Sequence, residues 1–210
     1  MSVVAVDLTA PEGPENLVRS ALDRHGRLDG LVNNVGGVTV RDGFLEIDDD
    51  AWRTSLELNL LTAVRMTRAA LPALLEGGGA IVHVASEAAH LPDPPIVDYA
   101  AAKAGLLSLS KALATEFGGR GVRSNVVSPG PTRTRLWEAP GGFADQLAEQ
   151  FDLEPEAAIE HFVNDVRGLS LGKLGSPADV ARVIAFLLSP SSSQITGSEY
   201  AVDGGALREI

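Results

Sequence analysis

Three side chains in the middle of the sequence have the types and the spacing that proton transfer requires. Tyr99 and Lys103 are four residues apart, so on a helix they share one face and lie one turn from each other. A tyrosine with a pKa of about 10 is a poor base at neutral pH, and a neighbouring ammonium favours its phenolate and lowers that pKa. We therefore expect Tyr99 to act as a general acid or base on an alcohol or carbonyl group, with Ser86 hydrogen-bonding the same oxygen.

The flanking sequence predicts the elements that would bring these side chains together. Residues 80–85 are an apolar, β-branched run typical of a buried parallel strand, which places Ser86 at the carboxyl end of that strand. Residues 99–117 have apolar side chains at spacings of three and four, which is typical of a helix with one buried stripe, and Asp98 is its expected N-cap. A tyrosine and a lysine at this spacing are also ordinary on a helix, so the rest of the chain must decide.

The composition limits the class of protein. The 210 residues suffice for a single α/β domain with a sizeable core, which we place at 1–210. A formal charge of -11 argues against nucleic acid or an anionic membrane as a partner. There is no cysteine, no basic leader at the start and no apolar run long enough to span a membrane, so we expect a cytoplasmic protein without disulfides.

Strand and helix patterns alternate along the chain. Short apolar runs and helical periodicities follow one another with brief turns between them, which predicts βαβ units and a parallel, doubly wound sheet of the Rossmann-like α/β class. The expected strands are 2–6, 28–32, 80–85, 121–128 and 198–202, and the expected helices are 14–25, 51–75, 99–117 and 177–188, the last with Ser176 as its N-cap.

The periodicity weakens over residues 135–174. Two short helical patterns there carry Trp137 and Phe143 among many carboxylates, and an insertion of this length beside a site predicts a substrate lid. Its aromatic residues favour a moderately hydrophobic small molecule and its carboxylates disfavour a polyanion. The alternative interpretation is an amphipathic hairpin that packs on a partner subunit.

An acidic cluster precedes the helix expected at 51–75. Glu46, Asp48, Asp49 and Asp50 could suggest a metal site, but carboxylates are favoured at a helix N-terminus, and we interpret them as capping residues. No histidine pair has metal-ligand spacing on one helix face, and we expect no metal.

Taken together, these residues resemble the short-chain dehydrogenase/reductase family. The pieces that match lie in the family's order across nearly the whole chain, with family-like spacing from Asn59 to Ser86 to Tyr99. They are Asn33-Asn34-Val35-Gly36, Asn59, Ser86, Tyr99 with Lys103, Pro129-Gly130 with Thr134, and Asp203-Gly204-Gly205.

The resemblance implies an NAD(P)-dependent oxidoreductase that interconverts an alcohol and a carbonyl by hydride transfer. Ser86 would orient the substrate oxygen, Tyr99 would exchange its proton, Lys103 would tune the tyrosine and hold the nicotinamide ribose, and Asn59 would support a linking water. The family also implies a homodimer or homotetramer that uses the helices containing Asn59 and Tyr99. The NAD or NADP contacts carried over are Asp7 and Leu8 at the adenine, Asn33 and Gly36 along the groove, and Tyr99, Lys103, Pro129, Thr132 and Thr134 toward the nicotinamide.

One departure from the family is large. The family begins with a strand, a Gly-x-x-x-Gly-x-Gly turn and a helix, and this sequence contains no such turn; its first strand matches the family's third. The unit not found, on the order of 30 residues, holds the cofactor's pyrophosphate and distinguishes NAD from NADP. We therefore expect an N-terminally truncated Rossmann-like domain in which cofactor binding is weakened or lost.

This departure leaves a structural question and a functional one. Without the missing strands, we expect Ser2 to Val6 to pair beside the strand at 28–32 or with another chain. The leading function is an active alcohol or carbonyl oxidoreductase. The alternative is a degenerate member of the family with no redox activity, serving as a non-catalytic partner subunit or as a cofactor-independent site that uses Ser86 and Tyr99.

Overall fold

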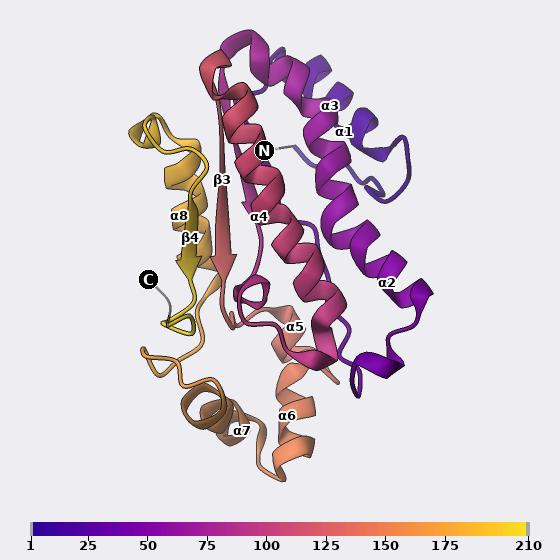
Figure 1. Ribbon diagram of the computed structural model, residues 1–210, viewed down its shortest axis with the longest axis vertical. Coiled ribbons are helices and arrows are strands. Elements are labelled where there is room, and N and C mark those ends of the chain that lie inside the picture. Colours follow the sequence, from indigo (N-terminus) through magenta and orange to yellow (C-terminus); the bar gives the residue numbers. More distant parts are fainter. Residues whose placement is uncertain (1, 209–210) are drawn as a thin grey trace.

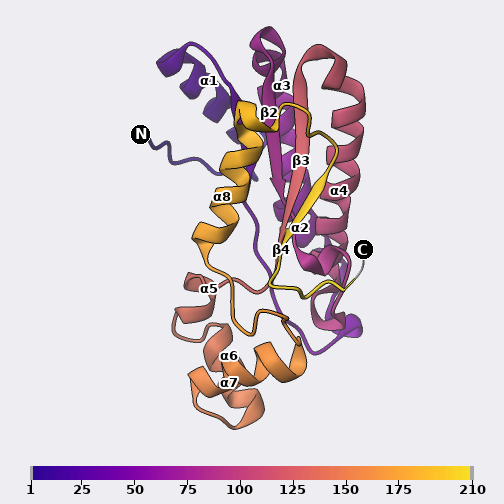
Figure 2. The same ribbon diagram turned by 90° about the vertical axis from the view of Figure 1, so that its left-hand side faces the viewer.

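The computed structural model describes residues 2–208, which form a parallel four-stranded sheet between helices (Figure 1). The strands follow chain order across the sheet: β1 (Gly30–Asn33), β2 (Gly79–Val84), β3 (Val122–Pro129) and β4 (Glu199–Val202). Helices α1 (Gly13–His25), α3 (Thr62–Gly77) and α4 (Val97–Phe117) pack on one face, and α8 (Pro177–Leu188) covers the other (Figure 2). The doubly wound α/β fold expected from the sequence is confirmed.

The remaining helices are short. The helix α2 (Asp49–Leu56) precedes α3 in the chain, and α5 (Arg135–Glu138), α6 (Phe143–Phe151) and α7 (Pro155–His161) lie beyond the carboxyl ends of the strands (Figure 1, Figure 2). None of the helices described has both the length and the apolar composition needed to cross a bilayer. Single-turn elements are η1 (Phe44–Glu46), η2 (Glu57–Leu61), η3 (Glu87–Ala89), η4 (Pro94–Ile96), η5 (Gly118–Arg120), η6 (Phe162–Val166) and η7 (Pro190–Ser192).

Alternation along β2 builds a core on each side of the sheet. Successive strand residues point to opposite faces. Ile81 packs with Leu74 of α3 in the cluster beneath α1, α3 and α4, whereas its neighbour Val82 packs with Leu187 of α8. The strand is therefore buried on both faces, as its mainly apolar, β-branched sequence indicated.

The helix expected at 51–75 is one helical run from Asp49 to Gly77 with a wide π-helical turn, η2, in its middle. Asp48 is its N-cap and accepts a hydrogen bond from the Ala51 amide at 2.8 Å, which confirms the capping interpretation. In the wide turn, the Thr62 hydroxyl donates to the Glu57 carbonyl at 2.8 Å. Among residues 2–208, no group of three or more His, Cys, Asp or Glu side chains could hold a metal ion.

The segment 135–174 starts and ends at neighbouring points. Thr132 and Gly175 form an isolated parallel bridge, and the Gly175 amide donates to the Pro131 carbonyl at 3.0 Å. Between these points the segment has an apolar cluster of its own, in which the Trp137 ring meets the Phe143 ring edge-on at 5.5 Å. At its exit, Ser176 and Asp179 form a reciprocal capping box that starts α8, so the expected N-cap is confirmed.

The strand expected at Ser2 to Val6 is not formed. These residues form no regular structure and are mostly exposed; the exposed fraction of Val3 is 80%. Within residues 2–208, β1 pairs only with β2. The Asp7 carboxylate accepts hydrogen bonds from the Thr9 amide at 2.9 Å and the Thr9 hydroxyl at 2.7 Å. This turn leads the chain directly into α1, so pairing beside β1, one of the two expected arrangements, is wrong.

Candidate active site

A cleft of about 880 Å³ lies at the carboxyl ends of the strands, against the segment 135–174. Ser86, Tyr99 and Lys103 all line it, so the structure brings together three of the four catalytic residues expected from the sequence. Tyr99 and Lys103 were also expected to contact the cofactor, and four further expected contacts line the same cleft, namely Gly36, Pro129, Thr132 and Thr134. Proton-transfer groups and candidate cofactor contacts therefore share one cavity.

Strand β2 and helix α4 position the proton-transfer groups. Ser86 follows β2 and caps η3, accepting a hydrogen bond from the Ala88 amide at 3.2 Å. Tyr99 and Lys103 lie in the first turns of α4, and the Lys103 ammonium is 5.5 Å from the centre of the Tyr99 ring. The buried Lys103 Nζ donates to the Val84 carbonyl at 2.8 Å, which fixes the ammonium between the strand and the tyrosine.

The electrostatics of this group differ from the expectation. The pKa of Tyr99 is raised rather than lowered: burial is the main cause, Glu87 adds to it, and the hydrogen bond from Ser86 only partly offsets it. Burial also lowers the pKa of Lys103 to about 8. The expectation of a lowered tyrosine pKa is therefore wrong for the chain on its own, because the burial of Tyr99 outweighs the stabilisation that a neighbouring ammonium gives its phenolate.

A buried histidine lies beside this lysine. His83, on β2, is fully buried, and its pKa is lowered to about 4 by burial and by the charge of Lys103. Its Nδ1 lies 3.2 Å from the Asn33 amide nitrogen, and its Nε2 has no partner among residues 2–208. The ring is therefore neutral at physiological pH and adds no positive charge to the site.

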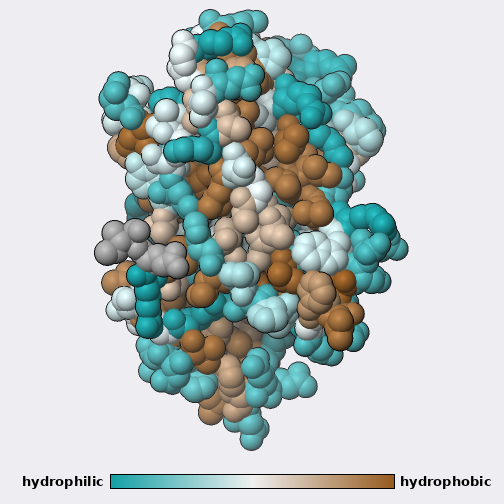
Figure 3. All heavy atoms as spheres, in the orientation of Figure 1, coloured by the Kyte–Doolittle hydropathy of each residue, from teal (hydrophilic) through white to brown (hydrophobic). Residues whose placement is uncertain are grey.

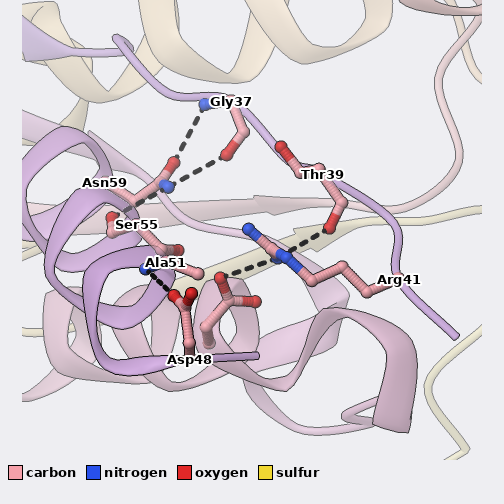
Figure 4. A network of polar contacts seen from close by, with 8 residues as sticks. Gly37, Thr39, Arg41, Asp48, Ala51, Ser55 and Asn59 are labelled. Carbon is pink, nitrogen blue, oxygen red and sulfur yellow. Dashed lines mark hydrogen bonds and ion pairs between the residues drawn. The ribbon is translucent and has the colours of Figure 1, made fainter. Parts of the chain in front are cut away.

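Asp98 was expected to cap α4, and this is wrong. The helix starts at Val97, two residues before the expected start at Tyr99 and directly after the η4 turn, so Asp98 lies inside its first turn and is buried. Its carboxylate accepts a hydrogen bond from Arg41 at 3.2 Å, and Arg41 also donates to the Thr39 carbonyl at 3.2 Å (Figure 4). The loop that follows β1 is thereby held against the start of α4, next to Tyr99.

Asn59 is buried in the wide turn η2 and holds the glycine-rich loop after β1. Its amide nitrogen donates to the Gly37 carbonyl at 2.9 Å and to the Ser55 carbonyl at 3.0 Å, and its oxygen accepts from the Gly37 amide at 3.0 Å (Figure 4). A Cβ at the adjacent Gly36 would lie 2.8 Å from the Asn59 oxygen and 3.2 Å from Lys103 Nζ. Asn59 lies behind the cleft wall and does not line the cleft.

Three expected cofactor contacts are not brought to the cleft. Asp7 is exposed and bonded to Thr9, while Leu8 packs against the core under α1 and α3. Asn33 is buried and donates to the Thr67 hydroxyl at 3.0 Å, whereas its neighbour Asn34 lines the cleft. Successive residues point in opposite directions as the chain leaves β1, which is why Asn34 lines the cleft and Asn33 does not.

Sequence reasoning missed a charged cluster in the cleft wall, made of Glu87, Asp93 and Arg167. Glu87 adjoins Ser86, which could have drawn attention to it. Arg167 lies far along the chain in the segment 135–174, and no spacing rule connects it to Glu87. The aromatic residues expected over the substrate, Trp137 and Phe143, do line the cleft.

Comparisons with known proteins agree with this geometry. The sequence model of a family described as enoyl-(acyl carrier protein) reductase matches residues 1–206. The oxidoreductase YvrD of Bacillus subtilis is 34% identical over 188 residues, which cover 88% of this chain and 70% of that protein. Cyclohexanol dehydrogenase of an Acinetobacter strain is 36% identical over 196 residues, which cover 92% of this chain and 70% of that protein.

Solved structures give the same result. The structure of L-sorbose reductase from Gluconobacter frateurii, complexed with NADPH and L-sorbose, matches with a TM-score of 0.90 at 33% identity. The match covers 99% of this chain and 77% of that one, so the matched fold accounts for all but a small part of the chain.

Proposed function

The chain belongs to the short-chain dehydrogenase/reductase family, and from this premise we propose that it interconverts an alcohol and a carbonyl group, with Tyr99 as the acid and base. NAD(P)-dependent oxidoreduction is the chemistry of the family. The observation that carries the proposal for this chain is that Ser86, Tyr99 and Lys103 line one cleft, with the lysine fixed on Val84 beside the tyrosine ring.

In the proposed mechanism the chain moves a proton at the Tyr99 hydroxyl. In the reducing direction Tyr99 donates to the carbonyl oxygen, and in the oxidising direction it accepts the alcohol proton. Ser86 hydrogen-bonds the same oxygen and orients it. The raised pKa of Tyr99 favours the protonated, donating form, and the Lys103 ammonium stabilises the phenolate that remains after transfer. The bound dinucleotide supplies or accepts the hydride.

The residues present fit the nicotinamide half of a dinucleotide. Gly36 leaves open backbone beside Asn59 and Lys103, where a side chain would collide, and the hydroxyl-bearing Thr132 and Thr134 line the same cleft. We propose that Gly36, Tyr99, Lys103, Pro129, Thr132 and Thr134 hold this half. The sequence contains no Gly-x-x-x-Gly-x-Gly turn, so we assign no residue to the pyrophosphate.

We propose that the segment 135–174 is a substrate lid. It is closed at its base by the bridge between Thr132 and Gly175, it has its own core, and its Leu136, Trp137 and Phe143 face the cleft. A moderately hydrophobic small molecule fits such a cover.

We also propose a homo-oligomer that uses the face carrying α4. In Figure 3, apolar atoms gather in the middle of this face, over α4 and the neighbouring α3. Ala101 and Ala104 are exposed on α4, and small side chains allow two helices to approach closely. Light scattering should give a dimer or tetramer, and Ala104→Arg should yield monomers. A monomeric unmodified protein would rule the interface out.

A second candidate function is a family member that performs no redox chemistry, either as a partner of complete subunits or as a cofactor-independent site. What favours it is that neither Asp7 nor Leu8 reaches the cleft and that the sequence has no phosphate-binding glycine turn. In this case the cleft would bind a small molecule without turning it over.

Titration with NADH and NADPH at millimolar concentration separates the two functions. We would follow cofactor fluorescence with this chain and with a chain extended upstream of Met1 by the family's glycine-rich unit. Saturable binding by either, followed by turnover of an alcohol, supports the oxidoreductase. Absence of binding by both would favour the second candidate.

A further inference from the structure

The cleft wall next to Ser86 contains a buried carboxylate with a free acceptor. Glu87 is 5% exposed and lines the cleft, and its Oε2 has no hydrogen-bond partner among residues 2–208. A buried polar atom without a partner costs roughly 1–3 kcal/mol. Oε2 itself is closed to solvent, so a ligand in the cleft meets the carboxylate at Oε1, and a donor there offsets part of the cost of burying the group.

A guanidinium stands beside this carboxylate. Arg167 Nε is 3.8 Å from Glu87 Oε1, which is too long for a direct hydrogen bond but short enough for one atom to contact both. Arg167 is held from its far side by an ion pair with Asp93 and lies over the Phe162 ring, 5.8 Å from its centre. A fixed N–H donor and a fixed carboxylate acceptor therefore lie side by side.

The combination of groups selects the chemistry of the ligand. A hydroxyl both accepts and donates, so it can bond Arg167 and Glu87 at once, whereas a carbonyl or an ether can only accept. Two carboxylates face a single guanidinium, and Asp203 lies close enough to raise the pKa of Glu87 further, so a carboxylate or phosphate would be repelled. A neutral group that both donates and accepts remains as the match, and a hydroxyl is the smallest such group.

We propose that Glu87 and Arg167 form a subsite for a second hydroxyl of the substrate, so that the cleft prefers diols and hydroxyketones to monohydric alcohols. This inference rests on the proposed function, because the first hydroxyl is the one handled by Ser86 and Tyr99. Glu87 and Arg167 determine specificity and take no part in proton transfer. The apolar residues of the segment 135–174 accommodate the rest of the molecule.

Binding of matched alcohols tests the subsite without requiring turnover. Trp137 lines the cleft, so its fluorescence can report binding. We would measure the dissociation constants of 1-hexanol, 1,2-hexanediol and 1,3-hexanediol by fluorescence titration. At least one diol should bind about tenfold more tightly than 1-hexanol, the size expected for a buried polar pair that gains its partner. Equal affinity for all three alcohols would overturn the proposal.

Variants locate the preference. Glu87→Leu should abolish the diol preference and leave 1-hexanol affinity within about twofold, because it removes both carboxylate oxygens at similar volume. Glu87→Gln, which keeps the packing if the leucine variant does not fold, should reduce the preference at least threefold. Glu156→Gln is the matched control. It removes a carboxylate that forms an exposed ion pair with Arg133 and does not line the cleft. Unchanged preference in the Glu87 variant that folds would overturn the subsite.

Turnover separates this inference from the proposed function. If the extended chain oxidises the diol and 1-hexanol with equal kcat/KM, the subsite is wrong while the oxidoreductase stands. If the diol binds preferentially through Glu87 but no NAD(P)H forms with either chain, the subsite is supported and the proposed oxidoreductase function is wrong.

Discussion

The two ends of the candidate site are built differently. At the carboxyl end of β2, Lys103 and Asn59 are buried and each is fixed by a backbone carbonyl or amide. At the N-terminal end, Asp7 is exposed, Leu8 belongs to the core under α1, and residues 2–6 pair with no strand. The proton-transfer group is built on β2 and α4 and is supported by η2 and by the loop after β1, so changes within residues 2–8 should leave it in place.

The largest effect should follow from removing the proton-transfer group. Tyr99→Phe should lower kcat by about 10²- to 10⁴-fold, because the reaction loses its general acid and base. Steady-state kinetics on the chain form that turns over would measure this. Tyr200→Phe is the matched control, since the chain has two tyrosines and Tyr200 packs under α8. A Tyr99→Phe variant with an unchanged rate would contradict the mechanism.

Removing the support behind the cleft should cost stability. Asn59→Ala removes the side-chain hydrogen bonds to the Gly37 amide and to the Gly37 and Ser55 carbonyls, and we expect a loss of about 2–4 kcal/mol in the free energy of unfolding. Urea denaturation would measure it. Asn16→Ala, at an exposed asparagine bonded only to Arg19, should change stability by less than about 0.5 kcal/mol. Equal losses in both variants would show that the wide turn does not depend on this amide.

The buried carboxylate should make stability depend on pH. The pKa of Glu87 is raised from 4.5 to about 7, mainly by burial, with Asp203 and Asp93 adding to the rise and Arg167 opposing it. A raised carboxyl pKa gives stability that is present below pH 4.5 and is lost as the pH rises through 7.

Glu87→Gln should therefore raise the free energy of unfolding at pH 8 by up to about 3 kcal/mol relative to its effect at pH 4.5. Urea denaturation at the two pH values would test this. If variant and parent differed in the free energy of unfolding by the same amount at pH 4.5 and pH 8, Glu87 would not be a buried charge at pH 8.

The smallest effect belongs to the N-terminal end. Asp7→Ala should change the dissociation constant for NADH by less than about twofold, because the carboxylate is exposed and bonded only to Thr9. Fluorescence titration of the extended chain would measure it. A tenfold weakening would show that residues 2–8 rearrange toward the cofactor, and the two ends of the site would then be coupled.

Local patterns were enough to predict β2, α4 and the proximity of Ser86, Tyr99 and Lys103, because strand and helix periodicities place side chains over short distances. Local patterns could not predict contacts between segments that are distant in the sequence. Arg41 neutralises Asp98, which therefore lies inside the helix instead of capping it, and Arg167 meets Glu87 through the fold. The sign of the Tyr99 pKa shift was missed because burial depends on the whole surroundings, whereas the sequence shows only the neighbouring cation.

The wide turn at Glu57–Leu61 allows one helical run to pack against two different parts of the fold. Before it, α2 packs on α4; after it, Met66 and Leu74 of α3 face α1 and the sheet. Inserting one more residue beside 57–61 at ordinary α-helical winding would rotate one half by about 100° against the other. One set of apolar side chains would then face water. Insertions should therefore be tolerated far less here than exchanges of side chain.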